Sequence, residues 1–302
     1  MSNKVVFFGN ERLIQGLRHT DLPILNGLYD AGFEILAIVA NNSEGKSRTT
    51  RPLEVGEFGK KHNIPVFLPE KPSEILSELK KLNADIGVLV AYGRIVPTEI
   101  IDIFPHSIVN VHPSRLPKYR GTTPIETAIL NGDKSTSVSL MSLTAEMDAG
   151  PIYKQKSLTI SDDETSLSLS EKCASIGTDL LIENLSKIIS GELKPRKQPH
   201  VSRDVSYTKK LTTSDGLLDP SVMTATECER RVRAFIGFPR TQINLLGREI
   251  IIIKAKSIDN YAGDDWPDII KCVNNTYLQI IELINPKSGK TMKTADYLRG
   301  LQ

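Results

Sequence analysis

The chain has 302 residues, of which 39% are hydrophobic and 25% charged, a composition typical of a globular protein long enough for two domains. The formal net charge is only +2, which excludes a uniformly basic nucleic-acid binder, so phosphate contacts must come from local patches. No apolar run approaches the roughly eighteen residues of a membrane span, and the apolar stretch at residues 5–8 is too short for a signal peptide. We therefore expect a cytoplasmic protein.

The first half of the chain alternates strand and helix signals. Short runs rich in apolar and β-branched residues predict strands at residues 4–8, 34–40, 65–68, 86–91 and 107–111. Apolar residues at helical spacing predict helices at residues 22–31, 53–62 and 73–82. Nearly continuous apolar runs are typical of strands buried on both faces of a parallel sheet. The pattern predicts a Rossmann-like, doubly wound parallel sheet, in which ligands bind beyond the carboxyl ends of the strands.

Two kinds of cofactor site are not indicated. The first turn, Gly9-Asn10-Glu11-Arg12, lacks the spaced glycines of a dinucleotide-binding loop. The cysteines, at positions 173, 228 and 272, have no metal-ligand spacing, so we expect buried reduced thiols and no metal.

The composition changes after residue 190. A predicted helix at residues 166–190 is followed by a segment with two prolines and several basic residues, which indicates an extended, positively charged connection. Beyond it, strand-like runs at residues 242–246, 249–255 and 278–284 accompany one predicted helix at 225–235. We predict a catalytic domain at residues 1–190, a basic linker at 191–206, and a small C-terminal β-barrel of the OB type at 207–302.

The densest chemical signal is the segment at residues 110–121, where a buried strand leaves the sheet. Alternation along a strand places Asn110 and His112 on the same face. A second strand, at residues 137–143, is followed by a turn that contains Asp148. This acidic residue is expected to face the loop after His112.

An amide, an imidazole and a carboxylate suit the transfer of an acyl-level carbon to an amine. Asn110 offers two N–H donors to a developing oxyanion, and one good donor is worth about 3–4 kcal/mol in other enzymes. His112 can take the proton of the attacking amine, while Asp148 fixes the imidazole tautomer or relays the proton through water. Taken singly, the three are more simply explained as a turn former, a packed or surface histidine and an Asx-turn residue.

The motifs, taken in order, resemble those of the 10-formyltetrahydrofolate-dependent formyltransferases. They are NVHPSRLPKYRG at residues 110–121, TPIETAILNGD at 123–133, MDAGPIY at 147–153 and VAYGRIVP at 90–97. The similarity continues through YTKKL at residues 207–211 to SGKTM at 288–292. It therefore covers nearly the whole chain.

The resemblance implies roles for individual residues. Asn110, His112 and Asp148 occupy the catalytic positions. The tetrahydrofolate-binding loop is Ser114, Arg115, Leu116 and Pro117, with Arg115 standing where the family usually has leucine, and backbone groups around Val90, Ala91 and Tyr92 hold the pterin ring. The implied formyl donor is 10-formyltetrahydrofolate, and the implied acceptor is the methionine amino group of initiator methionyl-tRNA, bound by a monomer. The tRNA contacts are assigned to Arg48, Arg51, Arg196, Lys197, Lys209 and Lys210.

Other functions share parts of this pattern. Sugar-nucleotide N-formyltransferases use the same Asn–His–Asp core, and the basic linker with its second domain favours tRNA over an amino sugar. A hydrolase of formyltetrahydrofolate and an RNA-binding protein without catalysis are further alternatives. The intact Asn110, His112 and Asp148 argue against the last.

Overall fold

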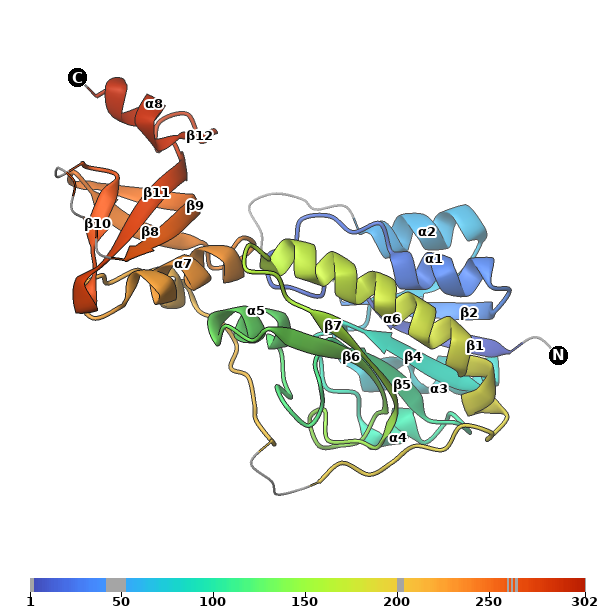
Figure 1. The fold of residues 1–302 in the computed structure, drawn as a ribbon. Helices are drawn as coiled ribbons and strands as arrows, with labels where there is room; N and C mark the ends of the chain where they lie inside the picture. Colours follow the sequence, from blue (N-terminus) through green and yellow to red (C-terminus); the bar gives the residue numbers. More distant parts are fainter. Residues whose placement is uncertain are drawn as a thin grey trace.

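The computed structural model describes residues 3–41, 53–199, 204–259, 261, 263 and 266–301. A layered α/β domain holds the first half of the chain, and a smaller, strand-rich domain lies beside it (Figure 1). A long connection links them.

The large domain is built on a seven-stranded sheet in the order β3-β2-β1-β4-β5-β6-β7. Strands β1 to β5 are parallel, whereas β6 and β7 run antiparallel to their neighbours. The doubly wound, Rossmann-like architecture is confirmed, with an antiparallel extension at one edge that the sequence did not predict. The strands are β1 (Lys4–Gly9), β2 (Glu34–Val39), β3 (Val66–Phe67), β4 (Ile86–Val90), β5 (Ile108–His112), β6 (Ser135–Ser142) and β7 (Ile152–Thr159).

Helices cover both faces of this sheet. One buried core contains residues of α1 (Pro23–Asp30), α2 (Glu54–His62), α5 (Pro124–Leu130) and α6 (Ser166–Ile189). The opposite core contains residues of α4 (Thr98–Ile101) and of α3 (Leu76–Leu82), which follows a 3-10 turn at Pro72–Ile75. Ile108 belongs to this second core. Asn110 and His112 therefore face the α3 and α4 side, because alternate residues of a strand share a face.

The smaller domain is a curled antiparallel sheet in the order β10-β11-β9-β8, with β12 paired to β11. This confirms the predicted strand-rich small barrel. Its elements are α7 (Ala225–Ala234), β8 (Thr241–Leu245), β9 (Arg248–Asp259), β10 (Ile269–Lys271), β11 (Thr276–Ile284), β12 (Thr291–Lys293) and α8 (Thr294–Arg299), with 3-10 turns at Thr213–Gly216 and Val273–Asn275.

The two domains share buried surface. The barrel has its own core, which includes Ile250, Leu278 and Leu283. Ala234 and Phe235, at the end of α7, instead belong to the core of the large domain. Helix α7 also packs against α5, so the barrel is docked on the large domain through apolar contact.

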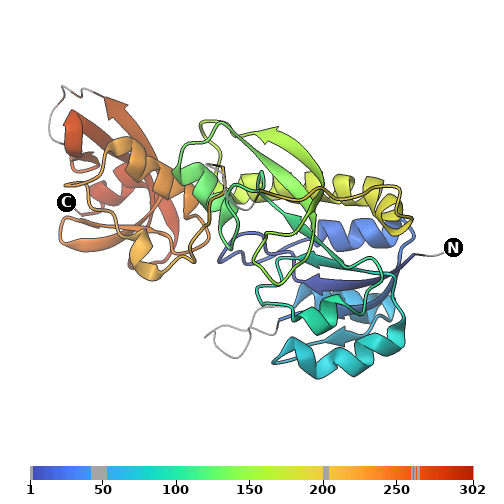
Figure 2. The same cartoon turned by 90° about the horizontal axis from the view of Figure 1, so that it is seen from below.

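Helix α6 determines the path of the linker. A capping box starts it, since the Thr165 hydroxyl accepts from the Ser168 N–H and the Ser168 hydroxyl accepts from the Thr165 N–H, each at 3.1 Å. Its 24 residues span about 36 Å at about 1.5 Å per residue and carry the chain away from the barrel. The linker must therefore return along the large domain (Figures 1 and 2).

Two buried carboxyl groups lie beneath the first loop of the sheet. Glu11 is 3% exposed and accepts the N–H groups of Ile24 and Leu25 at 2.9 and 2.7 Å, which caps α1. Glu126 is 1% exposed and accepts the Gln15 N–H at 3.1 Å. Burial raises the pKa of each carboxyl group to about 7, because desolvation disfavours the charged form.

These raised pKa values make stability depend on pH. Folded protein binds more protons than unfolded protein between pH 4.5 and about 7, so the free energy of unfolding falls as pH rises through that range. Glu126→Gln removes one of the two charges while keeping the acceptor for Gln15. As pH rises, we expect the free energy of unfolding of the variant to increase relative to that of the wild type. The difference should approach roughly 3 kcal/mol, at about 1.36 kcal/mol per unit of pKa shift.

Urea unfolding at pH 5 and pH 8 measures this effect. The exposed control Glu192→Gln is expected to keep the wild-type slope. An identical pH slope in Glu126→Gln would contradict the assignment of Glu126.

Candidate active site

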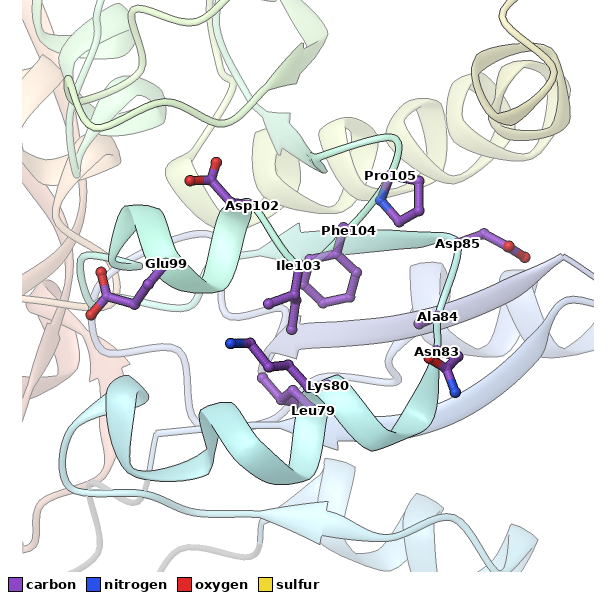
Figure 3. Close-up of a pocket in the computed structure, with 10 residues that line it drawn as sticks. All are labelled: Leu79, Lys80, Asn83, Ala84, Asp85, Glu99, Asp102, Ile103, Phe104 and Pro105. Carbon is purple, nitrogen blue, oxygen red and sulfur yellow. The ribbon is translucent and has the colours of Figure 1, made fainter.

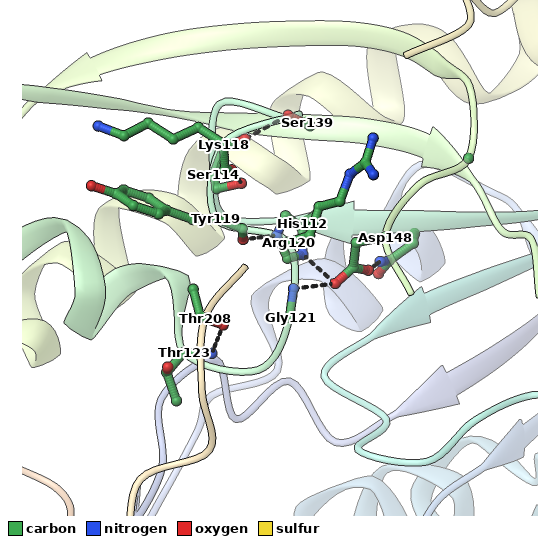
Figure 4. A network of polar contacts seen from close by, with 12 residues as sticks. His112, Ser114, Lys118, Tyr119, Arg120, Gly121, Thr123, Ser139, Asp148 and Thr208 are labelled. Atoms are coloured by element: carbon green, nitrogen blue, oxygen red, sulfur yellow. Dashed lines mark hydrogen bonds and ion pairs between the residues drawn. The ribbon is translucent and has the colours of Figure 1, made fainter. Parts of the chain in front are cut away.

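The structure brings together the three side chains that the sequence singled out. Asn110 and His112 lie two residues apart on β5 and are 6% and 4% exposed. Asp148 comes from the loop between β6 and β7 and has a φ of 49°, in the left-handed region. Figure 4 shows His112 and Asp148 turned toward each other beside Gly121.

Asp148 is the hub of the contacts. Its Oδ1 accepts the Asn110 Nδ2–H at 3.2 Å, and its Oδ2 accepts the Gly121 N–H at 2.8 Å. The same Oδ2 lies 3.7 Å from His112 Nδ1. One of the two Asn110 donors is therefore used internally, which leaves one for a developing oxyanion rather than the two expected from sequence.

The tautomer of His112 is set by the main chain. Its Nε2 lies 3.0 Å from the carbonyl oxygen of Tyr119. Because a carbonyl can only accept, the proton of the neutral imidazole must be on Nε2. Nδ1 then carries a lone pair on the side of Asp148. The sequence left two roles open for Asp148, fixing the tautomer or relaying the proton through water. In the structure the Tyr119 carbonyl is the group that contacts Nε2.

The predicted folate loop divides into framework and surface. Ser114 is fully buried, and its hydroxyl donates to the Lys118 carbonyl at 2.7 Å. Leu116 is 3% exposed, and its carbonyl accepts from Gln155 Nε2 at 3.0 Å. Arg115, which stands where the family usually has leucine, is exposed. Of these residues, Arg115 is thus the one whose polar side chain is presented to solvent.

The segment after β4 presents its backbone. The side chains of Val90 and Tyr92 are buried, and the Tyr92 ring packs edge-on against Phe8, with 5.9 Å between ring centroids. Ala91 and Gly93 have φ values of 50° and 72°. Within the described part of the chain, the backbone N–H and C=O groups of residues 91–93 make no hydrogen bond. They are therefore available to a ligand at the carboxyl end of β4.

The end of the returning linker and the first residues after it pack over the loop that follows His112. The Ser206 hydroxyl accepts from the Tyr119 N–H at 2.9 Å. Arg120 pairs with Tyr207 as an isolated parallel bridge. The Thr123 N–H donates to the Thr208 hydroxyl at 3.1 Å, as Figure 4 shows. These contacts, which sequence patterns did not reveal, fix the peptide whose carbonyl orients His112.

The predicted tRNA contacts fall into three groups. Arg196, Lys197 and Lys210 are exposed. Lys209 is also exposed but pairs with Asp215 at 2.6 Å. The Lys209 ammonium and the Thr212 N–H, which both donate to the Asp215 carboxylate, lower its pKa to about 2. Arg48 and Arg51 lie outside the described residues.

A cleft of about 530 Å³ lies at the end of the sheet that is opposite to His112 (Figure 3). Its lining includes Asp85, which precedes β4, and Pro105, which precedes β5. Since β4 and β5 are parallel, this cleft is at their amino ends, away from His112. Across residues 3–41, 53–199 and the described remainder, no group of acidic, histidine or cysteine side chains is placed to hold a metal ion. No described helix has the length and apolar character needed to cross a membrane.

Comparison with known proteins places this site in a family. Residues 33–185 match the formyl transferase family model. A methionyl-tRNA formyltransferase of Sulfurihydrogenibium sp. (strain YO3AOP1) is 36% identical over 91% of this chain and 92% of its own length. The chain belongs to the formyl transferase family. A methionyl-tRNA formyltransferase of Lactobacillus johnsonii is 34% identical over 92% of this chain and 91% of its own length.

Solved structures support the fold. An N-formyltransferase from Helicobacter canadensis, in complex with folinic acid and dTDP-3-aminofucose, aligns with a TM-score of 0.69 at 20% identity, covering 93% of this chain and 99% of its own. HypX from Aquifex aeolicus, in complex with tetrahydrofolic acid, aligns with a TM-score of 0.63 at 16% identity, covering 97% of this chain and 46% of its own. Asn110, His112 and Asp148 of this formyl transferase all lie inside the matched residues 33–185.

The tautomer of His112 can be tested directly. Nitrogen-15 NMR of the imidazoles is expected to show Nε2 protonated and Nδ1 unprotonated in the neutral ring, because the Tyr119 carbonyl only accepts. The His112→Gln variant assigns the signals among the five histidines. Asp148→Asn should leave the tautomer unchanged. A proton on Nδ1 in the wild type, or a tautomer switch in Asp148→Asn, would show that Asp148 sets the tautomer.

Proposed function

We propose that this protein acts as a methionyl-tRNA formyltransferase, moving a formyl group from 10-formyltetrahydrofolate to the α-amino group of methionine on initiator tRNA. The observation that carries the proposal is the pairing of an acceptor nitrogen, His112 Nδ1, with a donor amide, Asn110, around one carboxylate. Relatives of this name match across 91–92% of the chain, including the linker and barrel.

The three residues divide the chemistry of amine formylation. The amine attacks the formyl carbon, a C–N bond forms, and negative charge develops on the formyl oxygen. The free N–H of Asn110 Nδ2 stabilises that oxyanion. His112 Nδ1 takes the proton from the attacking amine and delivers it to N10 of the folate as the bond between the formyl carbon and N10 breaks. Asp148, 3.7 Å away, stabilises the imidazolium that exists between these transfers.

The donor site fits the backbone on the carboxyl side of β4. A pterin ring carries several amide-like donors and acceptors, which the unpaired main-chain groups of residues 91–93 can match. Arg115 is exposed on the neighbouring loop, where a guanidinium can meet the glutamyl carboxylates of a folate. The Helicobacter canadensis and Aquifex aeolicus proteins, whose structures contain folate compounds, support this type of donor.

The acceptor arm of the tRNA is assigned to the linker and the barrel. We infer a catalytic domain at residues 1–190, a linker at 191–206 and a tRNA-binding domain at 207–302, acting as a cytoplasmic monomer. Arg196, Lys197 and Lys210 are exposed on the path between the catalytic site and the barrel. Phosphate contacts of this kind supply most non-specific affinity for nucleic acid.

An amino-sugar nucleotide is the second candidate acceptor. The Helicobacter canadensis structure, which holds dTDP-3-aminofucose, covers 93% of this chain. Its identity of 20% is well below the 36% of the Sulfurihydrogenibium relative. The comparison therefore favours tRNA.

A transfer assay with purified protein tests the function. With 10-formyltetrahydrofolate, we expect formylation of charged initiator methionyl-tRNA and little of the elongator form. His112→Ala should lower kcat by about 10²–10⁴-fold because proton transfer is lost, and Asn110→Ala by about 10²–10³-fold because the oxyanion donor is lost. Transfer to dTDP-amino sugars without transfer to methionyl-tRNA would replace the proposal with the second candidate.

The salt dependence of tRNA binding tests the linker. Each phosphate contact contributes roughly 0.7–0.9 to the slope of log affinity against log salt. The triple variant with Arg196, Lys197 and Lys210 changed to alanine should lose roughly two to three units of slope and keep its affinity for the folate. Lys209→Ala should lose less, because Asp215 already pairs with that lysine.

The matched control changes Lys71, Lys80 and Lys81 to alanine. These exposed lysines lie by α3, near the cleft at the end of the sheet that is opposite to His112. An equal loss of slope in both triple variants would rule out a specific role for the linker.

A further inference from the structure

One linker side chain reaches the turn that carries Asp148. Gln198 is 6% exposed, although it is flanked by the exposed Lys197 and Pro199. Its Nε2 donates to the carbonyl oxygen of Asp148 at 2.9 Å and to that of Gly150 at 2.7 Å. Both bonds are to main-chain carbonyls of the turn, one of Asp148 itself and one of the residue two positions after it.

The amide of Gln198 has only one possible orientation. Its Oε1 accepts from Nε and Nη2 of Arg120 at 3.2 and 2.9 Å. A guanidinium has donors alone, and a carbonyl only accepts, so the oxygen must face Arg120 and the nitrogen must face the turn. Flipping the amide would place donor against donor and acceptor against acceptor.

Arg120 is held in place to serve this contact. It is 2% exposed, and its other side-chain bonds go to the Tyr207 hydroxyl at 3.1 Å and the Pro199 carbonyl at 3.3 Å. No carboxylate of the described chain pairs with it. A buried cation without an anion depends on its neutral acceptors. Arg120 and Gln198 therefore hold each other rigidly.

The turn needs such support. Asp148 has a φ of 49°, a left-handed conformation that typically costs a non-glycine residue about 1–3 kcal/mol and persists only where the surroundings impose it. Gly121 and Asn110 hold the side chain of Asp148, whereas Gln198 holds its main chain. The two sets of bonds together fix the carboxylate 3.7 Å from His112.

We propose that Gln198 is a positioning residue for catalysis: by bonding the carbonyls of Asp148 and Gly150 within the turn, it aligns Asp148 with His112. The inference rests on the proposed formyl transfer. The linker segment that carries the basic residues Arg196 and Lys197 would then also help to position Asp148. The alignment of Asp148 thus depends on an extended linker segment that is not part of the sheet.

Two substitutions separate positioning from simple packing. Gln198→Glu keeps the shape and strengthens the bond to Arg120, but its carboxylate cannot donate to the turn. Gln198→Met keeps the length and loses both contacts. If Gln198 positions Asp148, both variants should lose roughly 10- to 100-fold in kcat, with KM for tRNA and for folate within a few fold of wild type. Gln198→Glu should lower the Tm less than Gln198→Met does, because its carboxylate still pairs with Arg120.

The opposite results would overturn the inference. Wild-type kcat in Gln198→Glu, with loss only in Gln198→Met, would mean that Gln198 merely satisfies Arg120. A rise in KM for tRNA without a fall in kcat would mean that the added charge repels phosphate. Ser190→Glu, which adds the same charge at the exposed end of α6, is the control for that effect and should leave kcat unchanged.

A crystal structure of Gln198→Glu gives a readout that does not need the acceptor. The turn should shift and the distance from Asp148 Oδ2 to His112 Nδ1 should exceed 3.7 Å. An unmoved turn would overturn the positioning role whatever the protein formylates. Failure of the wild type to formylate methionyl-tRNA would instead remove the proposed function and leave this measurement intact.

Discussion

The site depends on the hydrogen bond from His112 Nε2 to the carbonyl of Tyr119. This 3.0 Å contact decides which imidazole nitrogen can accept a proton, and so makes Nδ1 a base on the side where Asn110 and Asp148 converge. The carbonyl lies in a loop rather than in the sheet. Its position therefore depends on the contacts that Ser206, at the end of the linker, and the adjacent Tyr207 make with that loop.

Most of the site is held by neutral or main-chain groups. Asp148 is bound by the Gly121 N–H, its peptide by Gln198, and Arg120 by an amide, a hydroxyl and a carbonyl. Fixed dipoles of this kind need no reorganisation when charge moves, which is the basis of electrostatic preorganisation in enzymes. His112 and Asp148 are consequently the ionisable pair at the centre of a polar frame.

The sequence predicted the sheet and the shared face of Asn110 and His112 because both follow from local patterns, whereas the assignment of Asp148 to the same site came from the family resemblance. Apolar runs gave β1, β2 and β4 nearly to the residue, and alternation placed Asn110 with His112. Strand β7 was missed because its edge position leaves residues such as Lys154 and Gln155 exposed, so no apolar alternation marks it. The Tyr119 carbonyl and Gln198 were missed for another reason. A main-chain acceptor has no sequence signal, and a glutamine among basic linker residues resembles a solvated one.

The length of α6 has a consequence for how such a protein can be taken apart. Asn110, His112 and Asp148 all precede residue 190, which suggests a self-contained module. Yet the helix carries the chain to the far end of the domain, and the polar contacts around Asp148 and Tyr119 are completed only where the chain returns, by Gln198 and residues 206–208. A chimera in which the barrel is replaced must therefore retain the native linker that returns along the large domain. The α/β domain ends near residue 190, whereas the contacts that complete the site come from residues further along the chain.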